Sequence, residues 1–167
     1  MAAPIRALAI TVSTRAAAGV YDDRSGPLLV SLLVAAGCEV DGPVVVPDGE
    51  PVDAELRSAI AGEYDVVVTT GGTGVSPTDR TPEMTARVIE REIVGIAEAI
   101  RAAGRTATPA AVLSRGIAGV CGRTLIVNLP GSTGGVRDGM AVVGPLIPHV
   151  VSQLAGADHP TRLGDAP

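Results

Sequence analysis

A glycine-rich turn that directly follows a valine-rich segment is the feature that most constrains the fold of this chain. The segment spans residues 65–70, and the turn reads Gly-Gly-Thr-Gly at residues 71–74. A short run of β-branched residues is typical of a parallel strand that is buried on both faces. Glycine lets the backbone adopt positive φ and bring its N–H groups close to an anion. The pattern therefore predicts an α/β fold with a phosphate site where this strand ends.

A helix is expected to begin shortly after the turn. Thr81 is a typical N-cap residue, Pro82 suits the first helical position, and Glu83 lies in the first turn. Asp79 stands between the glycine turn and this helix. A carboxylate beside a phosphate site indicates a metal-assisted reaction on phosphate rather than binding alone.

Strands and helices alternate along the whole chain. Strands are expected at residues 5–12, 38–46, 65–70, 117–120 and 124–128, and helices at 28–36, 51–61, 81–92 and 94–103, with two more after residue 135. Residues 112–114 fit a strand or a helix equally well. The alternation predicts a three-layer α/β/α fold with a mostly parallel sheet, and the last two strands form an antiparallel edge hairpin. We expect one domain over residues 1–157, followed by a polar tail at 158–167.

Four segments that carry polar or glycine-rich chemistry each follow an expected strand. They are Ser13, Asp48, the turn at 71–74 and a second glycine-rich turn at 130–135. Ligands of open parallel sheets bind outside the carboxyl ends of the strands, so these segments should meet at one edge. Asp48 and Asp79 would then be able to share a Mg²⁺ ion, which prefers oxygen ligands. Taken singly, each feature also has a purely structural reading, as a tight connection or an Asx turn.

The composition excludes several classes of function. All 13 basic residues are arginine, so a P-loop lysine, a Schiff base and a lysine general base are excluded. The net charge of −5 argues against binding a polyanion through a general positive field. With two Tyr and no Phe or Trp, the chain lacks stacking platforms for single-stranded nucleic acid. Phosphate groups must therefore be bound locally, by backbone N–H groups, single arginines and a metal ion.

The remaining features indicate a cytoplasmic protein without a membrane partner. Cys38 and Cys121 lie in no metal-binding spacing and are interpreted as buried hydrophobic residues in a reducing compartment. Residues 139–157 carry no charged side chain, but their prolines suit two short helices better than a membrane span. The first twelve residues are interpreted as a strand and not as an export signal. His149 and His159 are expected to have no catalytic role.

Two long motifs of the sequence resemble those of a known family. Residues 70–83, Thr-Gly-Gly-Thr-Gly-Val-Ser-Pro-Thr-Asp-Arg-Thr-Pro-Glu, closely resemble the signature of the MogA/MoaB proteins of molybdenum cofactor biosynthesis, a family that includes the G domain of gephyrin-type proteins. Residues 128–138 resemble its second ligand loop, and 113–116 and 17–23 also resemble family segments. The resemblance extends from about residue 5 to about residue 155.

The resemblance implies a molybdopterin-binding-like domain that assembles as a homotrimer. It also implies a nucleotidyltransferase reaction, in which Mg-ATP adenylylates molybdopterin and pyrophosphate is released, before a separate enzyme inserts molybdate. The partners would be molybdopterin, ATP and that molybdate-inserting enzyme. A carrier that binds molybdopterin without turnover is the alternative, whereas the chain is too short to be the molybdate-inserting enzyme itself.

The family's site residues map onto this sequence by motif. The two aspartates, with catalytic and metal-binding roles, correspond to Asp48 and Asp79. The ligand-binding positions correspond to Ser13, Gly71, Gly72, Thr73, Gly74, Pro130, Gly131 and Ser132. The Ser114-Arg115 segment is expected to approach the site, with Ser114 as a ligand contact. Thr14 stands where the family would have an acidic residue, which is a departure in the first loop. Arg80 and Arg137 fit either a phosphate contact or a solvated surface position, and Tyr21 fits either the pocket wall or a hydroxyl that fixes the first loop.

Overall fold

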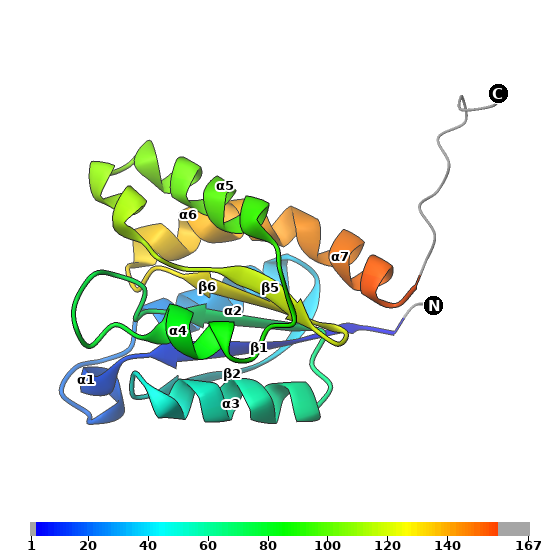
Figure 1. The fold of residues 1–167 in the computed structure, drawn as a ribbon, viewed down its shortest axis with the longest axis horizontal. Helices are drawn as coiled ribbons and strands as arrows, with labels where there is room; N and C mark the ends of the chain where they lie inside the picture. The colour runs from blue at the N-terminus through cyan, green and yellow to red at the C-terminus, as the bar shows by residue number, and fades with distance from the viewer. Residues whose placement is uncertain (1–2, 157–167) are drawn as a thin grey trace.

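The centre of the fold is a twisted sheet that lies between two layers of helices (Figure 1). In this computed structural model, which describes residues 3–156, six strands follow the order β2-β1-β3-β6-β5-β4. The strands are β1 (Ile5–Val12), β2 (Cys38–Val46), β3 (Val66–Thr70), β4 (Arg91–Glu92), β5 (Ala118–Cys121) and β6 (Thr124–Leu129). β2, β1, β3 and β6 are parallel, whereas β5 runs antiparallel to both β6 and β4. The predicted α/β fold with an antiparallel edge hairpin is confirmed.

The helices divide between the two faces of the sheet. They are α1 (Thr14–Ala17), α2 (Ser25–Ala35), α3 (Glu50–Ala61), α4 (Thr81–Ala86), α5 (Val94–Arg105), α6 (Thr133–Val143) and α7 (Ile147–Leu154), with 3₁₀ turns η1 (Pro109–Leu113) and η2 (Gly144–Leu146). Residues of α2, α5, α6 and α7 form one hydrophobic core with the sheet, and residues of α3 and α4 form the other. In Figure 1, α3 lies below the sheet, and α5, α6 and α7 lie above it.

Strand β3 shows why the valine run is fully apolar. Val66 and Val68 belong to the core beneath α2, α5 and α6, whereas Val67 belongs to the core beneath α3 and α4. All three side chains have no solvent exposure. Successive side chains on a strand point to opposite faces, so a strand covered on both sides needs an apolar residue at every position.

The expected helix over residues 81–92 is wrong beyond residue 86. α4 ends at Ala86, and the chain then runs along the edge of the sheet as β4, where the Glu90 N–H donates to the Val120 carbonyl at 2.8 Å. α4 and α5 pack on opposite faces, so the segment between them must pass around the edge of the sheet. A continuous helix cannot do this.

The start of α4 also differs from the expectation. Arg80 occupies the N-cap position, and Thr81 is the first helical residue, fully buried beneath the glycine turn. Residues 112–114, which the sequence left open, lie at the end of the 3₁₀ turn η1. Cys38 is buried as expected, but Cys121 is only partly buried at the hairpin, so that interpretation was wrong for the second cysteine.

The uncharged segment near the end of the chain forms short helices, as predicted. α6 ends at Val143, η2 contains Pro145, and α7 follows. Among residues 3–156, no helix combines the length and apolar character needed to span a membrane. The expected tail at 158–167, with His159, lies outside the described residues.

Candidate functional site

The carboxyl ends of the four parallel strands open into a large polar pocket. Its volume is about 1010 Å³, and it lies between the α1 segment and the loops that follow β2, β3 and β6. The predicted site residues that line it are Ser13, Asp48, Gly71, Gly72, Asp79 and Gly131. The structure therefore brings together the segments that sequence analysis expected to meet, although their roles stay predictions.

A second pocket, smaller and more apolar, adjoins the first. Its volume is about 490 Å³, and its wall is formed by α5, η1 and the start of α6, with apolar surface from Ile100, Ala111 and Leu113. The predicted ligand residues Thr73, Gly74, Ser114, Pro130 and Ser132 line this pocket and not the polar one. Three residues line both pockets, namely Gly72, Asp79 and Gly131. They mark the boundary at which groups bound in the two pockets would meet.

The glycine turn packs directly against the strand ends. Gly71 and Gly72 have φ values of +104° and +66°, which L side chains rarely adopt. A Cβ at Gly71 would collide with the Val12 carbonyl, and a Cβ at Gly72 would collide with the Asp48 carboxylate and the Thr81 hydroxyl. Glycine is required at both positions by conformation and by space.

The carbonyl groups of the turn accept hydrogen bonds from other parts of the protein, whereas its N–H groups at residues 72–74 donate none within the described residues. The Thr81 hydroxyl donates to the Gly71 carbonyl at 3.0 Å, and the Thr81 N–H donates to the Gly72 carbonyl at 3.1 Å. The Arg115 N–H donates to the Thr73 carbonyl at 2.7 Å. In a trans peptide the N–H points opposite to the carbonyl, so the N–H groups of residues 72–74 point away from these donors. Within residues 3–156 these N–H groups donate to no protein atom, and they are available to an anion.

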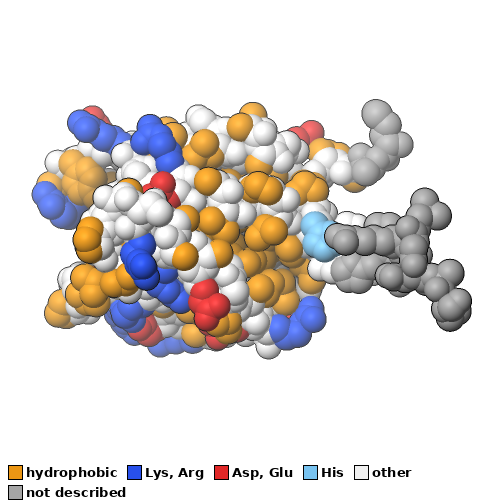
Figure 2. All heavy atoms as spheres, turned by 90° about the horizontal axis from the view of Figure 1, so that it is seen from above, with side chains coloured by type: hydrophobic (Ala, Val, Ile, Leu, Met, Phe, Trp, Pro, Cys, Tyr) orange, Lys and Arg blue, Asp and Glu red, His pale blue; other side chains and the backbone are white. Residues whose placement is uncertain are grey.

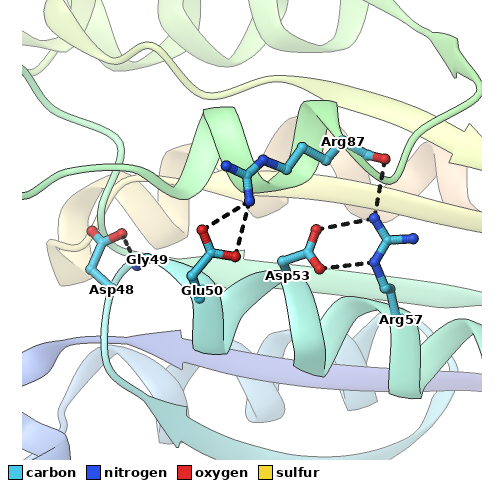
Figure 3. Close-up of polar contacts among 6 residues, drawn as sticks. All are labelled: Asp48, Gly49, Glu50, Asp53, Arg57 and Arg87. Carbon is cyan, nitrogen blue, oxygen red and sulfur yellow. Dashed lines mark hydrogen bonds and ion pairs between the residues drawn. The ribbon is translucent and has the colours of Figure 1, made fainter.

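Asp48 lies just before α3 (Figure 3), and its carboxylate lies against Gly72 of the turn. Its Oδ1 accepts hydrogen bonds from the N–H groups of Gly49, at 2.7 Å, and Arg80, at 3.0 Å. Thr14, the departure from the family pattern, accepts from the Asp48 N–H at 3.2 Å. Partial burial raises the pKa of Asp48 and the charge of Asp79 raises it further, while the two backbone hydrogen bonds oppose the rise. A nearby cation would stabilise the charged form of a carboxylate in this position.

Ion pairs hold α3 against α4 beside Asp48 (Figure 3). Arg87 donates from Nη1 to both carboxylate oxygens of Glu50 at 2.9 Å. Arg57 pairs with Asp53 at 2.8 Å and donates to the Arg87 carbonyl at 3.4 Å. Exposed pairs of this kind contribute little to stability one by one. The burial of Val52, Leu56 and Ala59 holds α3 on the sheet, and the contacts of Arg87 join its first two turns to the end of α4.

The two aspartates suit a hard divalent cation that binds together with phosphate. The Asp48 carboxylate lies against Gly72, and a Cβ built on Gly74 would lie 2.7 Å from Asp79 Oδ2, so both carboxylates border the same turn. Mg²⁺ is usually held by one or two carboxylates together with substrate phosphates and waters. In the described part of the chain, no three His, Cys, Asp or Glu residues gather as a metal cluster. Two carboxylates beside the same turn therefore fit a hard cation that takes its remaining ligands from phosphate and water.

Arg115 is a site residue to which sequence analysis assigned no role. Its Nε donates to the Gly74 carbonyl at 2.7 Å, its Nη2 donates to the Asp79 carbonyl at 2.7 Å, and its Nη1 pairs with Glu83. The guanidinium thus joins both ends of the loop that carries Asp79. The sequence placed Arg115 beside Ser114 but held no sign that the side chain reaches back across 41 residues.

Asn128 is a second residue that sequence analysis did not select. Its Nδ2 donates to the hydroxyls of Thr69, at 3.0 Å, and Thr85, at 2.9 Å, and its Oδ1 accepts from the Ile117 N–H at 3.2 Å. The side chain is buried and bonded on both its amide atoms. It ties β6 to β3, α4 and the segment before β5, which keeps the two glycine-rich turns side by side. Its only signal in the sequence was its place at the start of the second motif.

Comparison with known proteins is consistent with this geometry. Residues 8–149 match the family described as "Probable molybdopterin binding domain". The chain is 40% identical to a molybdenum cofactor biosynthesis bifunctional protein of Synechococcus elongatus, over 97% of this chain and 51% of that protein. It is 35% identical to the molybdopterin adenylyltransferase of Helicobacter pylori, over 88% of this chain and 86% of that protein.

A solved structure agrees with the fold along nearly its whole length. The molybdopterin biosynthesis Mog protein from Mycobacterium ulcerans superposes with a TM-score of 0.88 at 46% identity, covering 93% of this chain and 99% of that one. The chain spans about half the length of the bifunctional relatives that it matches. The family match over residues 8–149 and the shared fold show that the chain belongs to the molybdopterin-binding domain family of the MogA and MoaB proteins.

Proposed function

We propose that this chain adenylylates molybdopterin in molybdenum cofactor biosynthesis, with Mg-ATP as co-substrate. The observation that carries the proposal is the boundary between the two pockets, where Gly72, Asp79 and Gly131 line both. Two phosphorylated substrates, one in each pocket, would have their phosphates adjacent there. The 35% identity to a molybdopterin adenylyltransferase, of which this chain covers 86%, supports the same activity.

The proposed reaction joins two phosphate groups and needs no strong base. An oxygen of the terminal phosphate of molybdopterin attacks the α-phosphorus of ATP. As this P–O bond forms, the bond from the α-phosphorus to its bridging oxygen breaks, and pyrophosphate leaves with the electron pair. The attacking phosphate has a second pKa of about 6 and is largely ionised at neutral pH. This agrees with pocket walls that include neither lysine nor histidine.

In this proposal the protein positions the phosphates and neutralises their charge. Asp48 and Asp79 hold the Mg²⁺ ion, which when bound offsets the charge of the transferring phosphoryl group. The free N–H groups of residues 72–74 bind phosphate oxygens. Ser132 caps α6 by accepting from the Gly135 N–H at 3.0 Å, which presents the N-terminus of that helix to the same boundary.

The apolar pocket offers a surface for a flat ring. The chain has neither Phe nor Trp and neither tyrosine lines this pocket, so a ring there must rest on aliphatic side chains and peptide planes. Ile100, Ala111 and Leu113 supply such a wall, with the Ser114 hydroxyl beside it. The larger polar pocket would then take the more charged part of the paired substrates, next to Ser13 and Asp48.

The test is to combine purified protein with Mg-ATP and molybdopterin and to measure adenylyl-molybdopterin and pyrophosphate. Asp48→Asn and Asp79→Asn should each keep molybdopterin affinity and lose transfer by about 100-fold or more, because charge stabilisation at a phosphoryl group supplies effects of this size. Glu39→Gln, on an exposed position of edge strand β2, serves as the control and should act like the wild type. Binding without product by the wild type would instead support the carrier. Full turnover by both aspartate variants would contradict the roles assigned to them.

We further propose that the protein acts as a cytoplasmic homotrimer and passes its product to a molybdate-inserting enzyme. The proposal of a trimer rests on the family resemblance. It is supported by the apolar and uncharged surface of the side covered by α5, α6 and α7. Much of that surface is hydrophobic or uncharged in Figure 2, and residues 139–156 contain no charged side chain. The free thiols of Cys38 and Cys121 fit a reducing compartment. Light scattering should give three times the chain mass of 16.7 kDa, and a monomer mass would exclude the trimer.

A further inference from the structure

We propose that Arg115 is the positioning residue for Asp79, and that Arg101 in turn holds Arg115 in place. The inference rests on the proposed function, because it assigns Asp79 to the cation and phosphate site. In this proposal the Arg115 side chain contacts neither substrate, but it fixes the loop that carries the Asp79 carboxylate. Neither arginine belongs to the residues that the sequence motifs indicated as ligand contacts.

The loop at residues 75–79 has little other support. Val75 is 66% exposed, and residues 76–78 are also exposed. Inside the loop, the Asp79 N–H donates to the Ser76 carbonyl at 2.9 Å, and the hydroxyls of Ser76 and Thr78 lie 3.1 Å apart. No residue of this segment belongs to a hydrophobic core in the described structure. Its position therefore depends on what holds its two ends.

Arg115 bonds to both ends at once. Its Nε reaches the Gly74 carbonyl and its Nη2 reaches the Asp79 carbonyl, each at 2.7 Å. The Arg115 backbone N–H donates to the Thr73 carbonyl at 2.7 Å, so its backbone and its side chain bond successive peptides of the turn. A planar guanidinium fixes the separation of two acceptors, which a lysine ammonium cannot do in the same way. Arg115 thereby joins Gly74 directly to Asp79, in addition to the bonds that Thr81 makes to the Gly71 and Gly72 carbonyls.

Arg101 fixes the segment from which Arg115 projects. Its Nη1 donates to the carbonyls of Ser114, at 3.2 Å, and Gly116, at 3.0 Å, which flank Arg115. Arg101 and Ser114 line the apolar pocket, and Asp79 lines both pockets. A chain of contacts thus runs from α5, through Arg115, to the backbone of Asp79, whose side chain lies at the boundary.

The two aspartates differ in how they are held. Asp48 is set by backbone N–H groups of Gly49 and Arg80 that bond its carboxylate directly. Asp79 is set through its own carbonyl and the loop around it. The Arg80 N–H belongs to the same peptide as the Asp79 carbonyl, whereas the Gly49 N–H does not. Loss of Arg115 should therefore loosen Asp79 most, while Asp48 keeps its bond from Gly49. Removing a group that supports a metal ligand typically weakens metal affinity or activity by about 10–100-fold.

The experiment compares Arg115→Ala with two controls on the full chain. Glu83→Gln removes only the surface partner of Arg115 and keeps both carbonyl bonds. Arg123→Ala removes an exposed arginine in the turn between β5 and β6, at the opposite end of the strands. For each variant, hydrogen exchange of residues 75–80 is measured by mass spectrometry, together with Mn²⁺ binding in the presence of ATP and the Mg²⁺ dependence of turnover.

Arg115→Ala should speed amide exchange in residues 75–80 and raise the half-saturating Mn²⁺ and Mg²⁺ concentrations about tenfold. Millimolar guanidinium should restore part of the turnover of Arg115→Ala and none of that of Asp79→Asn. Both controls should keep wild-type exchange and stay within about twofold of its metal dependence, a margin well below the expected effect. If Arg115→Ala does not fold, Arg115→Lys carries the test, with faster loop exchange and weaker Mn²⁺ binding than the wild type.

Two results would overturn the inference. One is unchanged loop exchange or metal dependence in Arg115→Ala, and the other is a Glu83→Gln effect as large as that of Arg115→Ala. A wild type that forms no adenylyl product would remove the proposed function alone. In that case the exchange and Mn²⁺ measurements still decide whether Arg115 positions Asp79.

Discussion

Replacing Gly72 by alanine tests how the glycine turn is packed against the rest of the site. Gly72 has a φ of +66°, and a Cβ there would collide with the Thr81 hydroxyl and the Asp48 carboxylate. The substitution therefore imposes a strained backbone and also displaces two neighbours. These two costs can be estimated separately.

The backbone cost is about 1–2 kcal/mol, which is typical of an L-residue in the left-handed region. The collision forces the Thr81 hydroxyl away from the Gly71 carbonyl, which it bonds at 3.0 Å in a fully buried position. Leaving a buried polar group without its partner costs about 1–3 kcal/mol. Gly72→Ala should therefore lower the free energy of unfolding by about 2–5 kcal/mol, a large share of the roughly 5–15 kcal/mol of a typical domain.

Gly122→Ala is the matched control. Gly122 has a φ of +55°, and a Cβ there would meet nothing within 4 Å, so only the backbone cost of about 1–2 kcal/mol applies. Both variants are compared by urea denaturation followed by far-ultraviolet circular dichroism. The difference between them, about 1–3 kcal/mol, measures the collision. Equal losses in the two variants would refute the reasoning.

Two further outcomes follow from polar contacts of the described residues. Asn128→Leu should lower the free energy of unfolding by about 2–4 kcal/mol, because it leaves the Ile117 N–H and two threonine hydroxyls without their partner. The free energy is measured by urea denaturation, and a loss below about 1 kcal/mol would contradict this. The Arg115 guanidinium lowers the pKa of Glu83, so the stability from this pair is present at neutral pH and is lost as the pH falls through the lowered folded pKa. The difference in urea midpoint between wild type and Glu83→Gln should shrink on acidification, and a constant difference would contradict the pairing.

The strands and the loops after them could be predicted because each carries a local signal. The valine run of β3 and the glycines that end it are adjacent in sequence, and the order of strands places their carboxyl ends at one edge. The helix over residues 81–92 failed for the opposite reason. Its break depends on α4 and α5 packing on different faces, which no local pattern displays.

The candidate site divides in the same way. The position of Asp48 and Asp79 at one pocket could be predicted because they follow strands or turns that a sequence pattern reveals. The separation into two pockets was not predicted, since Ser114 reaches the second pocket through the turn η1 and not through a strand end. Arg115 acts on backbone carbonyls 36 and 41 residues away, and a carbonyl acceptor leaves no mark on residue type.

In the proposed phosphate site, which can use no lysine, the orientation of the backbone N–H groups is central. An arginine whose N–H groups donate to backbone carbonyls adds little charge next to a substrate. By fixing those carbonyls, it also fixes the direction of the N–H groups on the other side of the same peptides. Arg115 and Thr81 together bond the carbonyls of residues 71–74, and the N–H groups of residues 72–74 face the other way without protein partners among residues 3–156. Phosphate affinity should then be sensitive to any change that frees one of these carbonyls, even where no charged group near the substrate is altered. A protein with a net charge of −5 can bind anions in this manner because fixed dipoles act only at short range.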